Sequence, residues 1–434
     1  MKPVNVGICG LGTVGAGTLN VLTRNAGEIA RRAGRGINVA QIALRSKHPK
    51  CDIEGIATTD DVFVLAHNPQ IDIVVELIGG VDTARELVLA AIDQGKHVVT
   101  ANKALIAVHG NEIFERAREK GVIVAFEAAV AGGIPIIKAI REGLAGNRIH
   151  WLAGIINGTG NFILTAMQQQ GKSFAEALLE AQQLGYAEAD PRFDVEGIDA
   201  AHKLTILASI AFGIPLQFDK VYTEGIGQIT RADVNYAEAL GYRIKHLGIA
   251  RSGADGIELR VHPTLIPDER LLADVDGVMN AVMVSGDAVG QALFCGAGAG
   301  MDATASAVVA DLVDVVRALT TDPENRVPHL AFQPEALSDH PVLPIDQCES
   351  AYYLRIQAQD HPGVLAEVAR ILSTHNINIE SIMQKEAEEI DGLVPMILLT
   401  HRVQEARINQ AIGALENLAG VNGKVVRIRL ETLD

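Results

Sequence analysis

Short apolar runs rich in β-branched residues alternate with amphipathic stretches from residue 4 to about residue 130. The runs are nearly continuously apolar, and the stretches between them have the period of helices. This pattern predicts a parallel sheet covered by helices on both faces, which is a doubly wound α/β fold. The expected strands are Val4–Cys9, Asn38–Leu44, Ile71–Leu77, His97–Thr100 and Val122–Phe126, and the expected helices are Val14–Ala33, Thr83–Gln94 and Gly110–Glu119.

The pattern changes after residue 135, where longer helices and further strands follow without a second glycine fingerprint. Residues 321–350 carry five prolines and little periodicity, which is typical of a linker. We therefore expect a first domain over residues 1–135, completed by a helix that returns to it around 303–319. An α+β domain is expected over residues 136–302.

The last part of the chain, residues 351–434, has the pattern of a small separate domain. In Tyr352–Ala358, apolar and polar positions alternate, as in a strand with one buried face. The order of elements from there on is βαββαβ, which is ferredoxin-like. The remaining expected elements are the helix Val364–His375, the strands Ile377–Lys385 and Leu393–Thr400, the helix Glu405–Leu418 and the strand Val425–Leu430.

Composition narrows the possible functions. The formal net charge of −16 disfavours partners with a phosphate backbone or an anionic lipid surface, so we expect neither nucleic acid nor membrane as a partner. No apolar run approaches the ~18 residues of a membrane span, and no signal-peptide pattern is present, which predicts a cytoplasmic protein. The four cysteines stand apart from one another, which argues against a disulfide framework or a structural zinc site.

A glycine-rich turn follows the first expected strand and precedes a helix. In this context the turn predicts a Rossmann-type dinucleotide site: its glycines allow a tight turn, close approach of a pyrophosphate and close packing of the helix on the strand. The alternative is a purely structural turn. The residues of the turn are Gly10, Leu11, Gly12, Thr13, Val14 and Gly15.

The end of the second expected strand carries positive charge. NAD sites usually place an acidic residue there, whereas Arg45, followed by Lys47 and His48, suits a 2′-phosphate. NADP is therefore favoured over NAD. Arg45 could equally be a solvated loop charge.

Two lysines are candidates for chemistry. Lys103 follows the fourth expected strand, at the sheet edge that borders the ligand crevice in doubly wound folds. Lys203 lies four residues after Asp199 on an apolar helix expected over Val195–Phe212, so the two side chains share a face and the carboxylate can orient the amine for proton transfer. The alternatives are a helix-capping lysine for Lys103 and an ordinary helix salt bridge for Lys203.

Two further loops are candidates for binding. Acidic residues gather just before the apolar helix, at Glu188, Asp190 and Asp194. The loop over residues 127–135 is built from small residues, glycines and a proline, so its carbonyl oxygens could face a monovalent cation, although a simple turn fits the same pattern.

Taken together, these motifs resemble homoserine dehydrogenase in the form that carries a C-terminal ACT domain. The resemblance covers nearly the whole chain, and its most specific segment is GYAEADPRFDVEGIDAAHK over residues 185–203. The other matching segments are GLGTVG (10–15), TANK (100–103), EAAVAGGIP (127–135), NGT (157–159) and GAGAGMDATASAVVAD (296–311).

The resemblance implies reversible NAD(P)H-dependent reduction of L-aspartate 4-semialdehyde to L-homoserine, on the route to threonine, methionine and isoleucine. It implies that Lys203 donates a proton to the developing alkoxide and that Asp199 lies beside it to orient substrate or water. Lys103 would sit near the nicotinamide and the reacting carbonyl.

The resemblance also implies the binding residues. Glu188 and the Gly185 backbone would hold the amino-acid end of the substrate, and Asp194 would complete the polar network. The implied cofactor contacts are Leu11, Thr13, Val14, Arg45 and Gly300, and the implied ligands of a sodium-like ion are the main-chain oxygens of Glu127, Val130, Gly132 and Ile134.

For the C-terminal region, the segment Asp360–Leu365 resembles the start of ACT domains, where the loop before the first helix helps to form an amino-acid pocket. This implies feedback inhibition by threonine in a homodimer or homotetramer, with residues 136–302 serving catalysis and dimerisation. Deleting residues 351–434 would then remove inhibition and spare activity.

Two other functions remain open on the residues alone. An aspartate-semialdehyde dehydrogenase would need a reactive cysteine near a base in the middle domain. An NADP-binding amino-acid sensor would bind the same ligands without turnover.

Overall fold

The computed structural model describes residues 2–46, 51–384 and 393–434, so Lys47, His48 and Lys385 lie outside the described residues. The chain divides into two compact units, each discontinuous in sequence. The first unit comprises Met1–Gly158, Asp199–Val221 and Met279–His340, and the second comprises Thr159–Ile198, Tyr222–Val278 and Pro341–Asp434.

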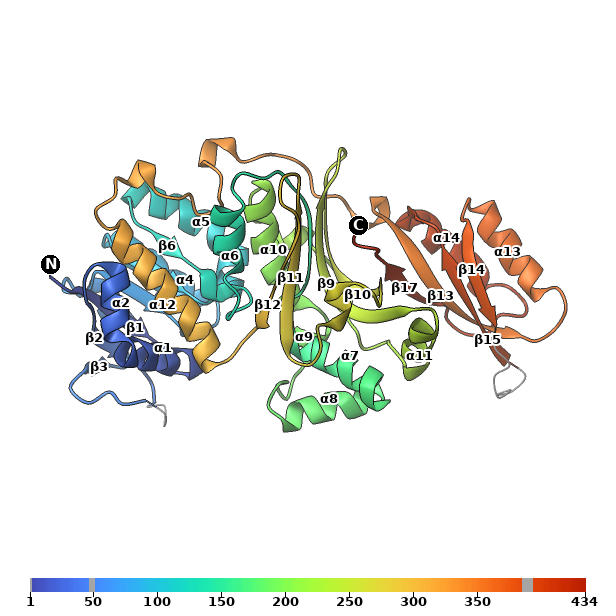
Figure 1. Cartoon of the computed structure of the whole chain (residues 1–434), viewed down its shortest axis with the longest axis horizontal. Coiled ribbons are helices and arrows are strands. Elements are labelled where there is room, and N and C mark those ends of the chain that lie inside the picture. Colours follow the sequence, from blue (N-terminus) through green and yellow to red (C-terminus); the bar gives the residue numbers. More distant parts are fainter. Residues whose placement is uncertain (1, 47–50, 385–392) are drawn as a thin grey trace. The chain divides into compact units, whose positions relative to one another are not determined.

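A parallel sheet of order β3-β2-β1-β4-β5-β6 forms the base of the first unit (Figure 1). All of its neighbouring strands are paired in parallel, which confirms the predicted doubly wound sheet. β1 and β5 have the predicted bounds, β6 is shorter than expected, and β3 was missed because it is only three residues long. The strands are β1 (Val4–Cys9), β2 (Ile37–Ala43), β3 (Ala57–Thr59), β4 (Ile73–Glu76), β5 (His97–Thr100) and β6 (Val124–Ala125).

Helices from both ends of the first unit's sequence pack together. α12, which is the predicted returning helix, lies beside α1 and α2 (Figure 1). The contact between α1 and α12 is close, since a Cβ atom on Gly17 would lie 2.5 Å from the main-chain oxygen of Met301. The helices of this part are α1 (Thr13–Arg24), α2 (Ala26–Ala33), α3 (Val62–His67), α4 (Asp82–Asp93), α5 (Lys103–Lys120) and α12 (Met301–Ala318).

Two helix predictions in this part need correction. The single helix expected over Val14–Ala33 is two helices, because the chain leaves helical geometry at Asn25. The helix expected from Gly110 begins at Lys103 instead, because Asn102 caps it.

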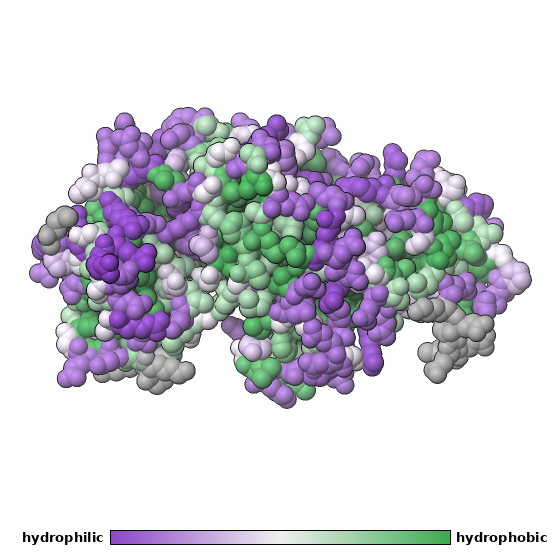
Figure 2. All heavy atoms as spheres, in the orientation of Figure 1, coloured by the Kyte–Doolittle hydropathy of each residue, from purple (hydrophilic) through white to green (hydrophobic). Residues whose placement is uncertain are grey.

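The first unit also contains an antiparallel group in which β11 (Met279–Gly286) pairs with both β7 (Ile149–Ile155) and β12 (Gly290–Ala297). In the space-filling view, hydrophilic residues cover α2, whereas hydrophobic residues gather around the β11–β12 hairpin (Figure 2). Further helical elements of this unit include α6 (Ile136–Lys138), the π-helical turn Ala139–Gly143 and nearly all of α10 (Ile198–Phe212).

The second unit is built on the long hairpin of β9 (Tyr242–Ser252) and β10 (Ile257–Pro267), to which β8 (Tyr222–Thr223) adds in parallel. A hydrophobic core lies between this hairpin and nearby helices. These helices are α7 (Gly158–Gln170), α8 (Phe174–Gln183), α9 (Arg192–Val195) and α11 (Arg231–Ala239).

The C-terminal residues have the predicted ferredoxin-like order, with sheet order β17-β13-β15-β14. This sheet continues into the β9–β10 hairpin, because β17 pairs in parallel with β10 through Thr264–Arg429 and Leu265–Leu430. The elements are β13 (Glu349–Gln359), α13 (Val364–Thr374), β14 (Ile379–Gln384), β15 (Leu393–Thr400), β16 (Val403–Gln404), α14 (Glu405–Glu416) and β17 (Val426–Leu430).

Within the described ranges, no helix combines the length and the hydrophobicity needed to cross a membrane.

Candidate active site

A buried carboxylate and two lysines form the centre of the candidate site in the first unit. The helix expected over Val195–Phe212 is divided at Gly197, whose φ of +85° ends α9, and α10 then begins at Ile198. Because Asp199 and Lys203 are one turn apart on α10, the Lys203 ammonium donates to Asp199 Oδ2 at 2.7 Å. Lys103 Nζ lies 3.1 Å from Asp199 Oδ1, so the structure brings all three predicted catalytic residues together.

Two groups on the segment after β7 complete this cluster. Lys203 Nζ also donates to the main-chain oxygen of Ile156 at 2.7 Å, and Asn157 Nδ2 donates to Asp199 Oδ2 at 2.8 Å. Asp199 is only 4% exposed. Burial alone would raise its pKa, but Lys203 and Lys103 outweigh this and hold the pKa of Asp199 at about 2. The cluster is therefore one carboxylate with two ammonium groups and carries net positive charge.

His202 is a member of this region that sequence reasoning missed. Its ring stacks on Phe218 with centroids 4.2 Å apart, and it is buried. Burial is the main reason that its pKa falls to about 4, and the two lysines lower it further against the opposing effect of Asp199. The one sequence feature that could have marked His202 is its position directly before Lys203 on an apolar helix.

The loop that presents Lys103 is held by a second buried carboxylate, Glu76, at the end of β4. Thr100 Oγ1 donates to Glu76 Oε2 at 2.6 Å, and the Ile78 and Gly79 amides donate to Glu76 Oε1. Burial raises the pKa of Glu76. Glu76 was not predicted to contribute, because an acidic residue that ends an apolar strand has no distinctive spacing.

The glycine fingerprint has the geometry that a dinucleotide phosphate requires. Gly10 adopts φ +98°, and a Cβ atom there would lie 2.5 Å from the Leu77 main-chain oxygen. A Cβ atom on Gly15 would collide with the Gly10 main-chain oxygen, so this glycine is needed for close packing. Gly12 has open space around it and is exposed, just before α1 begins at Thr13. Open space and free helix N-terminal amides are what a pyrophosphate needs.

The other predicted cofactor contacts differ in setting. Leu11 is buried and Val14 is half-buried, so their main chains are better placed to contact a ligand than their side chains. Gly300 is exposed and has φ +134° at the start of α12. Arg45 is exposed in the bend after β2.

The predicted cation loop follows β6 and is largely buried. Ala131 has φ +49°, and the Ile134 amide donates to the Ala131 oxygen at 2.6 Å, which turns the chain tightly. Two of the predicted oxygen ligands already accept hydrogen bonds: Glu127 O from the Val130 amide at 3.3 Å, and Ile134 O from the Ile136 amide at 2.7 Å. A carbonyl oxygen has a second lone pair, so neutral oxygen donors in this loop still suit a hard monovalent cation.

The Glu127 side chain is used elsewhere, at the start of α6. Its two oxygens accept the amides of Ile137 and Lys138, each at 2.9 Å, while Asp311 accepts the Glu127 amide. Burial, and then the charge of Asp311, raise the pKa of Glu127 to about 7.

Of the predicted substrate residues, Lys103 and Asp199 belong to the cluster in the first unit, and the other three lie in the second unit between the end of α8 and α9. Gly185 and Glu188 are exposed on the loop, and Asp194 is half-buried in α9. Gln182 Nε2 donates to the Glu188 main-chain oxygen at 3.1 Å, and Thr159 Oγ1 donates to the Tyr186 oxygen at 2.7 Å. The loop is thus fixed through its main chain, while the Glu188 carboxylate points to solvent.

Three of the four cysteines, Cys9, Cys51 and Cys348, give no support to thioester chemistry, which needs a lowered thiol pKa. Burial raises the pKa of Cys348 to about 11 and also raises the pKa values of Cys9 and Cys51. All four cysteines are free thiols. Among the described residues, no group of three or more His, Cys, Asp or Glu side chains could hold a metal ion.

Comparison with known proteins identifies three matching family models. The model described as "Homoserine dehydrogenase, NAD binding domain" matches residues 10–127, the model "Homoserine dehydrogenase" matches residues 135–313, and the model "ACT domain" matches residues 352–420.

Individual relatives agree with these models. A homoserine dehydrogenase from Pseudomonas aeruginosa is 77% identical over 434 residues, which is 100% of both chains. The crystal structure of a homoserine dehydrogenase from Thiobacillus denitrificans is 62% identical, with a TM-score of 0.94 and coverage of 100% of this chain and 99% of that chain. A hyperthermophilic archaeal homoserine dehydrogenase in complex with NADPH is 28% identical, with a TM-score of 0.62, and covers 72% of this chain and 98% of its own.

Proposed function

The chain belongs to the homoserine dehydrogenase family, and from that premise we propose that it reversibly reduces L-aspartate 4-semialdehyde to L-homoserine with NAD(P)H. The observation that carries the proposal is the position of two ammonium groups on one buried carboxylate, Asp199, beside the end of a dinucleotide-binding sheet. Such a cluster can stabilise and protonate an oxygen that becomes negative, which is what carbonyl reduction requires. We place the reaction on the route to threonine, methionine and isoleucine.

When bound, the nicotinamide supplies hydride to the substrate carbonyl carbon, or accepts it in the reverse direction. In this proposal the Lys203 ammonium transfers a proton to the carbonyl oxygen as negative charge grows there. Asp199 stays ionised throughout, because its pKa of about 2 is far below neutral pH, and it fixes the direction of Lys203 Nζ. Lys103 adds a second positive charge close to the same point.

Substrate binding is assigned to the loop of the second unit. The exposed carboxylate of Glu188 suits the substrate ammonium group, and the Gly185 main chain and Asp194 would complete the contacts. The exposed Arg45 beyond β2 favours NADP over NAD, because its guanidinium can pair with a 2′-phosphate. The archaeal relative solved with NADPH supports a nicotinamide cofactor.

The experiment that tests this assignment is Lys203→Met, with Lys96→Met as a control. Lys96 is also a buried lysine that donates to two main-chain oxygens, but these belong to Asn68 and Ile71, away from the candidate site. We expect Lys203→Met to lower kcat by about a hundredfold or more, the size of a lost general acid. NADPH binding, followed by cofactor fluorescence, should be preserved. Near-normal turnover by Lys203→Met would exclude Lys203 as the proton donor.

We also propose that the loop over residues 127–135 holds a monovalent cation such as sodium. The support is its buried, tightly turned backbone and the neutral oxygen donors of Glu127, Val130, Gly132 and Ile134. The cation would fix the loop between β6 and α6. Thermal unfolding in sodium chloride compared with choline chloride tests this, since an equal Tm in both salts would remove the site.

The ACT domain, which matches residues 352–420, supports regulation by an amino acid, and we propose threonine as the effector. The loop before α13 would form part of its pocket, and Gly363, with φ +104°, shapes the start of that helix. Inhibition of the full chain by L-threonine, but not by D-threonine, is the expected result.

A homodimer or homotetramer is proposed from the edge strand β12. This strand ends the antiparallel group of the first unit and lies where hydrophobic residues gather (Figure 2). Phe294 and Leu293 are half-buried on it. Sedimentation of Phe294→Glu against the parent protein tests this surface, and an unchanged mass would exclude it.

Four free cysteines also fit the proposed cytoplasmic location.

A further inference from the structure

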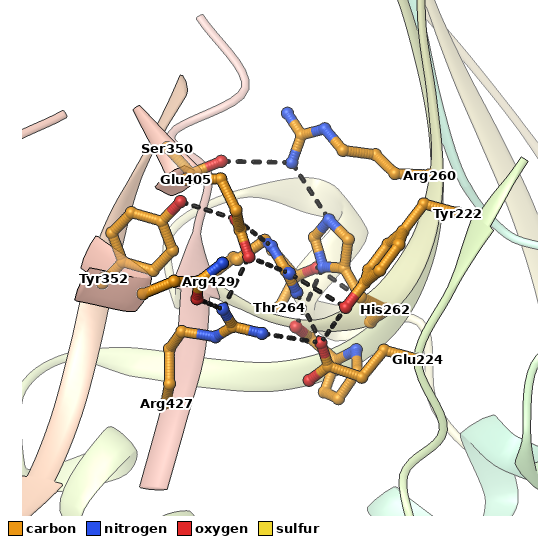
Figure 3. Close-up of polar contacts among 12 residues, drawn as sticks. Tyr222, Glu224, Arg260, His262, Thr264, Ser350, Tyr352, Glu405, Arg427 and Arg429 are labelled. Carbon is orange, nitrogen blue, oxygen red and sulfur yellow. Dashed lines mark hydrogen bonds and ion pairs between the residues drawn. The ribbon is translucent and has the colours of Figure 1, made fainter. Parts of the chain in front are cut away.

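A network of buried charged and aromatic side chains in the second unit joins the C-terminal domain to the β8–β10 region (Figure 3). Its charges form two balanced groups. Arg427 and Arg429 pair with Glu224 and Glu405, while Arg251 and Arg260 pair with Glu258 and Glu431.

The first group centres on Arg429, which is 1% exposed. Its guanidinium binds both oxygens of Glu405, at 2.9 Å through Nε and 2.6 Å through Nη2, and lies over the ring of Tyr222. Arg429 Nη1 then reaches Glu224 Oε2 at 2.8 Å, and Arg427 and Tyr222 donate to the same oxygen (Figure 3). One carboxylate oxygen of Glu224 is therefore held by three donors, two of which come from β17.

The main chain at Glu224 is held equally firmly. The Glu224 amide donates to Val261 O on β10 at 2.8 Å, and the Glu224 oxygen lies 3.0 Å from His246 Nε2 on β9. Two residues later, the Ile226 amide donates to the main-chain oxygen of Val195 at 2.9 Å. A Cβ atom on the intervening Gly225 would lie 2.7 Å from that same Val195 oxygen, so the two segments touch through their backbones.

Val195 is the last residue of α9 and precedes Asp199 by four positions. We propose that Glu224 is a positioning residue: held by Arg427 and Arg429 of the C-terminal domain, it fixes the backbone contact to Val195 and thereby sets where the catalytic helix α10 begins. This rests on the proposed roles of Asp199 and Lys203. The C-terminal domain thus acts on the start of the catalytic helix through one carboxylate.

The use of charge at this point supports a role in geometry. Buried ion pairs contribute little net stability compared with apolar packing, but they tolerate few arrangements. Burial would raise the pKa of Glu224, but the charges and hydrogen bonds of Arg429, Arg427 and Tyr222 together outweigh burial and lower this pKa, so Glu224 is ionised. Removing the charge of Glu224 leaves Glu405 as the only carboxylate that pairs with Arg427 and Arg429. The two arginines would then no longer hold the segment at residues 224–226 in place.

The test compares Glu224→Gln with Arg355→Met in the full-length enzyme. Arg355 is a matched control, since it also joins the C-terminal domain to the rest of the second unit through an ion pair, with Asp233 at 2.7 Å, but does not contact residues 224–226. We expect Glu224→Gln to lower kcat by about fivefold, a typical size for a coupling residue, with an unchanged NADPH dissociation constant. Arg355→Met should lower Tm to a similar extent and leave kcat as it is.

Hydrogen exchange gives a readout that a merely structural role would not change selectively. The Ile226 amide should exchange faster in Glu224→Gln and at the parental rate in Arg355→Met. Gly225→Ala, which pushes on the Val195 oxygen directly, should reproduce the loss of kcat with the ion pairs intact. Equal kcat in Glu224→Gln and Arg355→Met, or an unchanged exchange rate at Ile226, would overturn the proposal. If the catalytic assignment itself is wrong, this shows in a different experiment, because the Lys203→Met enzyme would then be active.

Discussion

At the scale of single residues, Asp199 determines what the two lysines can do. A carboxylate that kept its usual pKa while buried would be protonated more easily and would hold an ammonium group less firmly. Here, the two ammonium groups offset the free-energy cost of burying the Asp199 carboxylate and keep it ionised. The cluster therefore retains one surplus positive charge at the point where the substrate oxygen is proposed to lie.

Part of this cluster could be predicted from the sequence. The spacing of four residues between Asp199 and Lys203 requires a shared helix face, and the structure has this contact at 2.7 Å. The contact of Lys103 with Asp199 could not be derived by spacing, because it depends on how the end of β5 meets α10. For the same reason, the hydrogen bond from Lys203 to Ile156 could not be foreseen.

A testable prediction at this scale concerns Glu127, whose pKa of about 7 lies above the ordinary value of 4.5. The folded protein then binds a proton more tightly than the unfolded chain. The stabilisation is complete below about pH 4.5 and is lost as the pH rises through 7, so this group alone would lower the free energy of unfolding by about 3 kcal/mol over that interval. Urea unfolding between pH 5 and 8 measures this slope.

Asp311→Asn should flatten the slope, because the charge of Asp311 is the second cause of the raised pKa of Glu127. Asp314→Asn is the matched control: Asp314 pairs with the same Lys138 at 2.6 Å, but it is not among the groups that shift Glu127. If all three proteins share one slope, Glu127 does not titrate in this range.

At the scale of elements, the start of α5 connects the dinucleotide sheet with the proposed catalytic cluster. Periodicity predicted a helix only from Gly110, because residues 103–109 show no clear polar face. The missing information was chemical: Asn102 Oδ1 accepts the Leu105 amide at 3.1 Å as the helix cap, and Asn102 Nδ2 donates to Gly80 O at 2.6 Å. The cap places Lys103 on the first turn of the helix, where it reaches Asp199.

These two bonds of Asn102 can be separated by substitution. Asn102→Asp keeps the cap acceptor and loses the bond to Gly80, whereas Asn102→Ala loses both. We expect Asn102→Ala to lower the free energy of unfolding by about 1 kcal/mol through the lost cap. Asn102→Asp keeps the cap but brings a second carboxylate to the buried Glu76, which Asn102 now hydrogen-bonds, so we expect it to lower stability as well. Both variants should lower kcat, since both free the loop before Lys103.

Stability is measured by urea unfolding and activity by nicotinamide absorbance. A kcat that falls only in Asn102→Ala would assign the effect to the cap and not to the link with Gly80.

At the scale of the whole molecule, the βαββαβ order of the C-terminal region was predictable, and the family comparison confirms an ACT domain there. What the pattern could not show is that β17 also pairs with β10, because only Thr264–Arg429 and Leu265–Leu430 form this pairing. A contact between two short segments so distant in sequence leaves no periodic signal. The network around Arg429 could not be predicted either, since each of its charged residues resembles a surface residue when considered alone.

This pairing changes what we expect from deleting residues 351–434. The deletion would remove β17 from β10 and leave Arg260, which is fully buried, without Glu431. Arg260 would keep Glu258 at 2.9 Å, so losing Glu431 costs less than the about 3–5 kcal/mol of a fully unpaired buried charge, and the loss of apolar contacts adds to it. The core of the second unit would also be opened, since it includes Ala351, Tyr353, Ile397, Leu399, Ile428 and Leu430.

We therefore expect a chain truncated after residue 350 to lose most of its activity by failing to fold, and not to emerge as an active enzyme that is insensitive to threonine. Circular dichroism and calorimetry of the truncated chain would show a much lower Tm or no cooperative transition. Gly363→Ala in the full chain is a milder probe of the proposed effector pocket, because φ +104° strains any other residue there while β17 stays in place. A truncated chain with parental Tm and kcat would mean that the β10–β17 pairing adds little, and that the C-terminal domain is an independent attachment.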